Sequence, residues 1–218
     1  MNGEQLRRLP WELTHRRGAM LASRVREQIV RATHLHCTVR FEDPVYLGPG
    51  FRLDIPQNGT LIVARHTQFR LGFYCEISGD GTVTVGEGCA FTYYCHVACT
   101  TSISIGNRCT IAKSALIVDG SHRFRDLDIP MLQQGYDYRP ITIGDDALIH
   151  ANCTVINDVG ERSVIAANAV VTKPIPAYCV AAGVPARVIE YFGPPEQCPP
   201  GLEHLIVRGR GNGFEAVG

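Results

Sequence analysis

Apolar residues return at every sixth position through most of this chain. The successive frames run Val85-Phe91-Val97-Ile103, Ile105-Ile111-Ile117, Ile143-Ile149-Val155 and Val159-Ile165-Val171, after a weaker frame Val63-Phe69-Cys75. A helix repeats its apolar residues at spacings of three and four residues. Simple alternating strands do not keep a six-residue spacing across the turns between them. Six residues suit a short strand plus a corner, and three such units close one coil of a three-sided prism. The pattern predicts an all-β fold, a parallel β-solenoid over residues 43–190.

The corners of the predicted coils are marked by small residues. The fifth position of a hexad points inward at a crowded corner, and it holds Cys89, Cys95, Cys109, Ala115, Ser121, Ala147, Cys153, Ser163 and Ala169. The second position, where a side chain is least welcome, holds Gly86, Gly106, Gly144 and Gly160. Four of the nine cysteines are thus explained as small inward residues, and Cys75 starts a hexad. A nucleophilic or metal-binding role for these thiols is the weaker interpretation.

The repeat stops after Ser121-His122 and resumes at Ile141 or Ile143. The coils on either side must still stack, so residues 123–140 are expected to leave the prism as a loop. A tolerated insertion is one explanation. Function is favoured because such loops often carry it and because this one starts at a histidine. Neutral imidazole, with an ordinary pKa of about 6.5, takes a proton near neutral pH.

Residues 45–190 resemble the bacterial hexapeptide-repeat acyltransferases. The most specific stretch runs from Ile143-Gly144-Asp145-Asp146 to Ala182-Gly183-Val184-Pro185-Ala186-Arg187-Val188-Ile189, and it is similar to the closing coils of sugar, antibiotic and lipopolysaccharide-type O-acetyltransferases. The resemblance implies a left-handed β-helix. The handedness comes from the resemblance alone, because right-handed crossovers are the general rule.

The resemblance also implies a reaction, in which an acetyl-type group passes directly from coenzyme A to a hydroxyl or amine. His122 matches the catalytic base, and Asp119 is a candidate to fix its tautomer. The backbone N–H of Ala151 matches the donor to the oxyanion. The family usually has Gly where His150 stands, and a solvated His150 is the safest expectation.

The end of the repeat resembles the coenzyme A site of the family, so acetyl-CoA or another acyl-CoA is the implied co-substrate. Thr172 and Lys173 match the element beside the 3′-phosphate, and Arg187 matches a basic residue after the Gly-x-Pro-Ala turn. Solvated charge is the alternative for both basic residues. Ala166 and Ala167 match the small residues of the pantetheine groove. No Gly-rich phosphate loop of the Walker or dinucleotide type occurs in the sequence.

The two ends of the chain are expected to be appendages. Residues 1–42 form an N-terminal segment with a helix over 18–34, in which Leu21, Val25 and Ile29 share one face. Packing of this helix on the prism is favoured over contact with a membrane surface, because Glu4, Glu12 and Glu27 dilute the arginines. Residues 191–218 are expected to be a loose tail or a strap between subunits.

The charge balance and the apolar runs of the sequence limit which binding partners and which cellular compartment are expected. Lys and Arg number 21, as do Asp and Glu, which argues against a nucleic-acid binder. No apolar run approaches the roughly 20 residues of a membrane span, and no export signal is visible, so a cytoplasmic protein with reduced thiols is expected.

Two other functions stay open. A zinc enzyme of the γ-carbonic-anhydrase type shares this solenoid but needs three converging histidines, whereas His66, His96, His122 and His150 are isolated in the sequence. A non-catalytic assembly surface would need neither the aligned histidine nor the cofactor-like tail. The resemblance implies a homotrimer with grooves between prisms and a sugar or glycan-like acceptor. The aromatic candidates for stacking on it are Tyr93, Tyr94, Phe124, Tyr136 and Tyr138.

Overall fold

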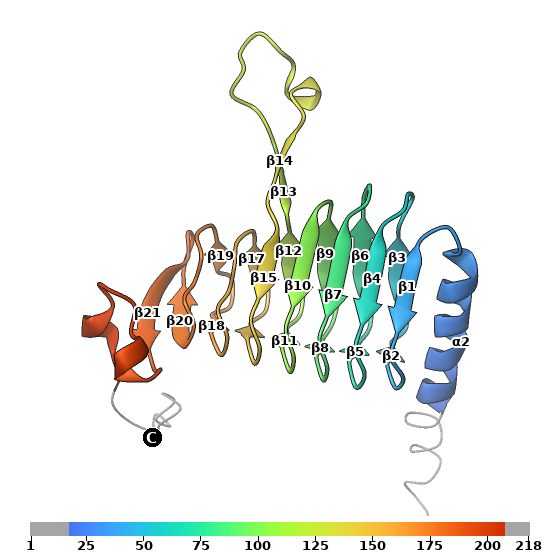
Figure 1. Ribbon diagram of the computed structural model, residues 1–218, viewed down its shortest axis with the longest axis horizontal. Coiled ribbons are helices and arrows are strands. Elements are labelled where there is room, and N and C mark those ends of the chain that lie inside the picture. The colour runs from blue at the N-terminus through green and yellow to red at the C-terminus, as the bar shows by residue number, and fades with distance from the viewer. Residues whose placement is uncertain (1–17, 208–218) are drawn as a thin grey trace, which may run out of the picture.

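A computed structural model describes residues 18–207 of the 218-residue chain. A helix lies at one end, a row of stacked coils follows, and a two-stranded ribbon projects from the side of the row (Figure 1). The strands of the coils gather in three parallel sheets, and the chain passes from sheet A to sheet B to sheet C in each coil. This is the arrangement of a parallel solenoid, as the six-residue pattern predicts.

Short strands form each sheet in the following order. Sheet A contains β1 (Thr38–Phe41), β4 (Thr60–Val63), β7 (Thr82–Val85), β10 (Ser102–Ile105) and β15 (Ile141–Ile143). Sheet B contains β2 (Tyr46–Leu47), β5 (Gln68–Phe69), β8 (Ala90–Phe91), β11 (Thr110–Ile111), β16 (Leu148–Ile149), β18 (Val164–Ile165), β20 (Cys179–Ala182) and the antiparallel β21 (Arg187–Tyr191). Sheet C contains β3 (Arg52–Asp54), β6 (Tyr74–Ile77), β9 (His96–Cys99), β12 (Leu116–Val118), β17 (Thr154–Val155) and β19 (Val170–Val171).

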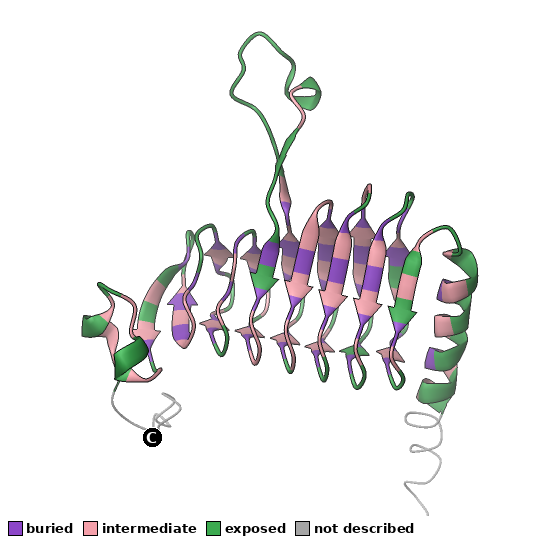
Figure 2. Ribbon diagram, in the orientation of Figure 1, coloured by how far each residue is buried: buried purple, intermediate pink, exposed green. Residues whose placement is uncertain are grey.

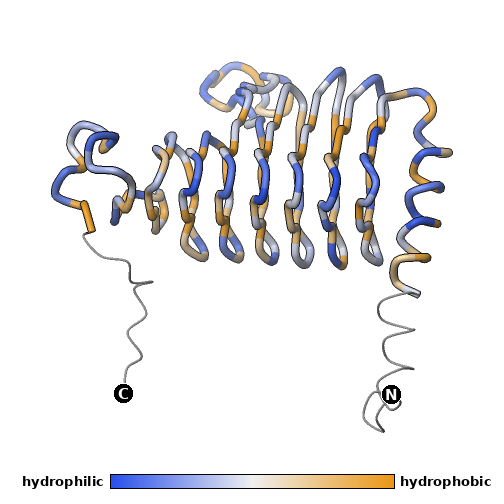
Figure 3. Tube along the Cα trace, turned by 60° about the horizontal axis from the view of Figure 1, so that its bottom comes forward, coloured by the Kyte–Doolittle hydropathy of each residue, from blue (hydrophilic) through white to orange (hydrophobic). Residues whose placement is uncertain are grey.

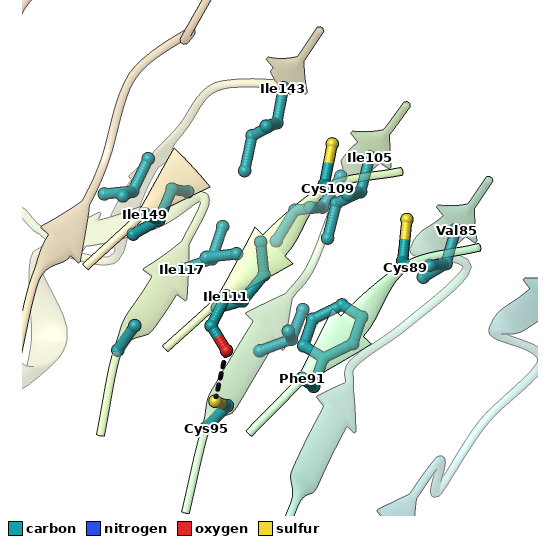
Figure 4. Packing of buried hydrophobic residues seen from close by; sticks show 14 of the residues in the cluster. Val85, Cys89, Phe91, Cys95, Ile105, Cys109, Ile111, Ile117, Ile143 and Ile149 are labelled. Carbon is teal, nitrogen blue, oxygen red and sulfur yellow. Dashed lines mark hydrogen bonds between the residues drawn. The ribbon is translucent and has the colours of Figure 1, made fainter. Parts of the chain in front are cut away.

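The core fills the inside of the coils. Every residue in the predicted hexad frames is buried, and equivalent residues of successive coils stack in register, as Val83, Ile103 and Ile141 do. Figure 4 shows this packing for the central coils, with Cys89, Cys95 and Cys109 at the corners. All nine cysteines are free thiols, and seven of them are buried. Of the residues predicted at the small inward position, Ser121 is wrong, because it lies exposed on the projecting ribbon.

Adjacent coils approach so closely at the A–B corner that glycine is required there. A Cβ atom on Gly86 would stand 2.6 Å from the backbone carbonyl carbon of Gly106, one coil further on. Gly106, Gly144 and Gly160 meet the following coil in the same way. Glycine is therefore needed at the second hexad position because the backbones of adjacent coils approach closely there, and not because the position requires an unusual φ.

The N-terminal helix α2 (Gly18–Thr33) closes the first end of the row, where it packs against β2. Ser23 and Val30 are its buried residues, and Ser23 Oγ accepts a 2.7 Å hydrogen bond from the N–H of Leu47. The helix packs on the prism as expected, but its row of Leu21, Val25 and Ile29 lies outside that contact, with 67%, 52% and 56% of these side chains exposed. Regular strands begin at Thr38, ahead of the predicted boundary at residue 43, because β1 pairs with β4.

The C-terminal segment covers the last coil. Two short 3₁₀ helices, Pro195–Gln197 and Glu203–Leu205, follow β21, and Val207 N–H donates to the carbonyl of Tyr191 at 3.0 Å. Leu202, Leu205 and Ile206 pack against the core, so the expected loose tail is wrong for residues 193–207. The rest of that segment, 208–218, lies outside the described residues, as do Arg7, Arg8 and Trp11 of the N-terminal segment.

Figure 3 shows apolar and polar residues alternating along every coil, as expected of strands that bury one side. Within residues 18–207, no helix is both long and apolar enough to cross a bilayer.

Replacement of Gly86 with Ala is expected to reduce the free energy of unfolding by about 2–3 kcal/mol, because the new methyl group meets backbone of the next coil. Gly135→Ala is the control: it has a φ of +79° but nothing within 4 Å of the added carbon, so a loss of only about 1 kcal/mol is expected. Urea denaturation of both variants measures the difference. Equal losses would contradict the close-approach explanation.

Candidate active site

The ribbon that carries His122 leaves the solenoid where the chain passes from sheet C to sheet A, here called the C–A edge. Strands β13 (Gly120–His122) and β14 (Tyr136–Tyr138) pair antiparallel, with His122 opposite Tyr136. Their rings lie 4.2 Å apart between centroids, at an angle of 39°. A Cβ on Gly120 would stand 2.7 Å from the Tyr138 ring, so glycine lets that ring lie across the root of the ribbon. His122 is exposed and held by an aromatic neighbour at the rim.

Two hollows meet at His122. One, of about 480 Å³, lies between the ribbon and sheet C and is also lined by Glu76, Ser78, Tyr136 and Tyr138. The other, of about 590 Å³, lies on the side of the loop and is also lined by Arg123, Phe124 and Arg125. The imidazole therefore faces space for a small acceptor on both sides, with aromatic rings beside it.

The loop beyond the ribbon has internal order. The side-chain amide of Gln134 donates to the carbonyls of Asp126 and Ile129 at 2.8 and 2.7 Å, and its oxygen accepts from Asp126 N–H. Arg123 and Asp137 form a 2.7 Å ion pair across the ribbon. These contacts make residues 123–135 a shaped wall for the hollow rather than an unstructured insertion.

Asp119 has a different role from the one suggested by its spacing from His122. Its carboxylate is buried and accepts hydrogen bonds from the N–H groups of Thr100 and Thr101 and from the hydroxyl of Thr101, at 2.6–3.1 Å. The described contacts contain no hydrogen bond from Asp119 to His122. The carbonyl of Asp119 accepts from Arg139 N–H at 2.8 Å, which closes the root of the ribbon. Asp119 thus fixes the ribbon to the preceding coil, and the tautomer role is corrected to a positioning role.

Cys99 completes the surroundings of this carboxylate. Burial, and then the negative charge of Asp119, raise the pKa of the Cys99 thiol to about 12. The thiol stays protonated and lies 3.5 Å from Asp119 Oδ2, to which it donates. A thiol held in this form is a poor nucleophile, which agrees with a structural role.

Thr172 and Lys173 lie on the same edge as His122. They follow β19, which is two strands beyond β12 in sheet C, a separation of about 10 Å along the stack. The carbonyl of Thr172 accepts a 3.1 Å hydrogen bond from the side-chain amide of Asn157, in the coil between. Lys173 is exposed and has no ion pair among the described residues.

The alanines predicted for the thioester and pantetheine lie on a different edge, where the chain passes from sheet B to sheet C. Ala151 follows β16, while Ala166 and Ala167 follow β18, one coil further on. The N–H of Asn168 donates to the carbonyl of Ala151 at 2.9 Å, which joins the two corners. Ala167 is exposed, and the side-chain amide of Asn152 donates to Asn168 Oδ1 at 3.2 Å beside it.

The N–H of Ala151 has no acceptor among residues 18–207. The same is true of the equivalent N–H groups of Lys113 and Ala167, so a free donor is a property of this corner in each coil. His150, next to it, is exposed. Arg187 opens β21 opposite Ala182, beside the end of the B–C edge, and its guanidinium donates to the carbonyl of Ala186 at 3.0 Å.

One copy of the chain therefore does not bring the predicted residues together. Asp119, His122, Thr172 and Lys173 mark the C–A edge, whereas Ala151, Ala166, Ala167 and Arg187 mark the B–C edge. Tyr93 and Tyr94 also belong to the B–C edge, away from His122. Among residues 18–207, no three metal-binding side chains cluster.

Several residues at the rim were not singled out in the sequence. Glu76 and Ser78 line the hollow beside His122, and Thr100 and Thr101 hold Asp119. The signal that finds them is the register: Glu76, Ala98 and Val118 occupy equivalent outward or edge positions in three successive coils. They become neighbours only once the coil length is known.

Residues 140–173 match the family model described as bacterial transferase hexapeptide (six repeats). The chain carries this repeat and resembles the hexapeptide-repeat acyltransferases, with sugar O-acetyltransferases among its relatives. Galactoside O-acetyltransferase of Escherichia coli is 33% identical over 152 residues, which cover 68% of this chain and 58% of that protein. The chain spans between 30% and 75% of the length of the first curated relatives that it matches.

Solved structures share the fold. A hexapeptide-repeat acetyltransferase of Vibrio cholerae, in complex with acetyl coenzyme A, has a TM-score of 0.54 and 22% identity, over 77% of this chain and 79% of that chain. A mutant of an N-acyltransferase of Bacillus cereus, in complex with dTDP and coenzyme A, has a TM-score of 0.63 and 15% identity, over 76% and 89% of the two chains.

Replacement of Asp119 with Asn is expected to reduce the free energy of unfolding by about 2–3 kcal/mol, because hydrogen bonds to a buried charged acceptor are lost. Asp137→Asn removes a carboxylate from the exposed ion pair with Arg123, for which a loss below about 1 kcal/mol is expected. Denaturant titrations of both variants measure the effect. If Asp119→Asn is no more destabilising than Asp137→Asn, the positioning role is refuted.

Proposed function

We propose that this chain is a coenzyme A-dependent acyltransferase, an O-acetyltransferase of a sugar or glycan-like acceptor, with His122 as general base. The observation that carries the proposal is the place of His122. It stands at the rim between two hollows, on the edge that also holds Thr172 and Lys173, in a chain that carries the transferase hexapeptide repeat. The sugar O-acetyltransferases among its relatives support the choice of acceptor.

The proposed reaction needs no covalent intermediate on the protein. The imidazole of His122 takes the proton of the acceptor hydroxyl while its oxygen attacks the thioester carbonyl. The carbon–sulfur bond then breaks, and the departing thiolate of coenzyme A takes the proton back from the imidazolium. Holding both substrates at one rim supplies much of the acceleration, since the attack becomes effectively unimolecular.

The B–C edge provides what the thioester requires. A free N–H at Ala151 is suited to receive the negative charge that develops on the carbonyl oxygen. Ala166 and Ala167 leave room for a narrow pantetheine arm. Lys173 and Arg187 are positive charges suited to the phosphates at the other end of coenzyme A. These roles become compatible with His122 when the C–A edge of one copy faces the B–C edge of the next.

We therefore infer a ring of copies, with three as the expected number. Such a contact joins unlike surfaces and closes into a ring when the rotation between copies allows it. The outward residues support the choice of faces. In the coils around His122, the outward positions of sheet A hold Thr82, Thr84, Ser102, Ser104 and Thr142. The outward residues on or beside sheets B and C include Leu116, Val118, Leu148, Ile156 and Val164, together with Thr110 and Thr154. Apolar side chains on the B and C side fit a surface that a neighbouring copy covers.

The coils are proposed to be left-handed. In Figure 1 the chain advances away from α2 as it descends in the near sheet A and ascends in the far sheet C, which supports this hand. The hexapeptide-repeat transferases of similar fold support it as well.

Replacement of His122 with Ala is expected to reduce turnover about 10²–10⁴-fold, because the acceptor proton then lacks a base. Binding of acetyl-CoA, measured by calorimetry, is expected to stay within about twofold of wild type. Turnover is measured as release of free coenzyme A thiol across a panel of sugars and amines. His150→Ala, an exposed histidine on the other edge, is the control. Unchanged turnover in the His122→Ala variant would show that His122 is not the general base.

A mixture of two inactive variants tests the shared site. His122→Ala removes the base, and Ala167→Trp fills the groove on the B–C edge. In randomly mixed rings, one contact in four joins an intact His122 edge to an intact groove, so activity of about a quarter of wild type is expected. Co-expression with two affinity tags supplies the mixed rings. A mixture as inactive as its components refutes the shared site.

A further inference from the structure

The outer side of α2 is an apolar row that nothing in the described chain covers. Leu21, Val25 and Ile29 follow at intervals of four residues, so they lie along one side of the helix. Ser23 and Val30 are buried against the solenoid, about half a helical turn away. Figure 2 shows the same division, with buried residues only on the side of α2 that faces the coils.

This row is unusual for the molecule. The branched residues of the hexad frames are buried, whereas these three are 67%, 52% and 56% exposed, and Met20 next to them is 40% exposed. A shallow hollow of about 440 Å³ runs along the row and is also lined by Arg24, Gln28 and Ala32. The stripe is long enough for a contact along more than two turns of the helix.

The N-terminal part of the sequence carries an excess of positive charge. Residues 1–36 contain seven arginines and three glutamates, a net charge of +4. The whole chain has 21 basic and 21 acidic residues, which leaves 14 and 18 in residues 37–218, a net charge of −4. Arg26 and Arg31 are engaged with the carbonyls of Leu47 and Phe41, while Arg24 lies beside the apolar row in the same hollow. An apolar row with an excess of arginine is the composition of a helix that lies in a membrane interface.

The positive charge also indicates which partner covers the row, a second copy of α2 or an anionic bilayer. A second copy of α2 on this face would bring two ends of the same positive sign together, at a cost. An anionic bilayer instead attracts each arginine near its surface. The helix lies across the end of the row of coils, and its outer side faces away from them (Figure 1). A flat surface therefore reaches the apolar row without meeting the solenoid.

We propose that α2 binds the surface of anionic lipid bilayers, with Leu21, Val25 and Ile29 in the boundary between headgroups and acyl chains. Arg24, which lies beside the row, contacts the lipid phosphates. The proposal does not depend on the acyltransferase activity. If the copies form a ring, their helices lie at one end of it and engage one surface together, which strengthens the binding.

The test is sedimentation of the full chain with vesicles. Wild type is expected to bind vesicles of phosphatidylcholine with 30% phosphatidylglycerol, and to bind several-fold more weakly to phosphatidylcholine alone or in 0.5 M salt. The triple variant Leu21→Ser, Val25→Ser, Ile29→Ser is expected to bind at least about tenfold more weakly. Because these side chains are exposed, the variant should fold, which circular dichroism checks.

The matched control is Leu127→Ser with Leu132→Ser, two exposed leucines of the ribbon loop that are 97% and 83% exposed. This control is expected to bind vesicles as wild type does, and so is His122→Ala. Equal binding by the triple variant and the control overturns the proposal. Failure of the wild type to bind vesicles also overturns it. In that case, a lower molar mass for the triple variant than for wild type, measured by light scattering, would assign the row to contact between copies. Neither outcome bears on turnover with a soluble acceptor.

Discussion

The distance between successive coils governs the rest of this structure. Neighbouring strands in a sheet lie about 4.8 Å apart, and three sheets at once must keep that spacing. The corners therefore admit glycine, alanine, serine or cysteine where backbone meets backbone, and the interior takes one or two apolar residues from each strand of a coil. A side chain that is too large at one corner cannot be relieved locally, because all three sheets share the same step.

The fixed spacing between coils also explains where the chain carries its insertion. Extra residues cannot enter a coil without breaking its register with both neighbours, so the insertion leaves at a corner as a ribbon. Asp119 anchors that departure to the previous coil through Thr100 and Thr101, and Arg139 closes the return. His122 is thereby fixed to the solenoid only four residues beyond Val118, the last residue of β12. In the proposed transfer, this rigid edge holds His122 in a fixed position relative to the two bound substrates.

The sequence predicted the inward residues well because the period of six reports directly on burial: each residue of the predicted frames is in the core. It also predicted the position of the outward loop. It could not predict that Asp119 turns toward Thr101 rather than toward His122, since spacing along a chain does not give the direction of a side chain. The failure at Ser121 has the same origin, because the hexad count continues past the point where the ribbon departs. The spacing of Leu21, Val25 and Ile29 is typical of the packed side of a helix. The side of α2 that packs on the solenoid is the opposite one, through Ser23 and Val30.

The two proposals, taken together, constrain the acceptor. The His122 rim belongs to the fourth coil, three steps of about 4.8 Å beyond the first. The helix itself lies within the headgroup layer, since its apolar row reaches the boundary with the acyl chains. A solenoid standing on α2 would therefore hold its rim roughly 15 Å above the headgroups, too far for a lipid headgroup itself. An acceptor joined to the same membrane would reach His122 only through an extended chain of several units, so an oligosaccharide fits this geometry better than a single lipid-linked sugar.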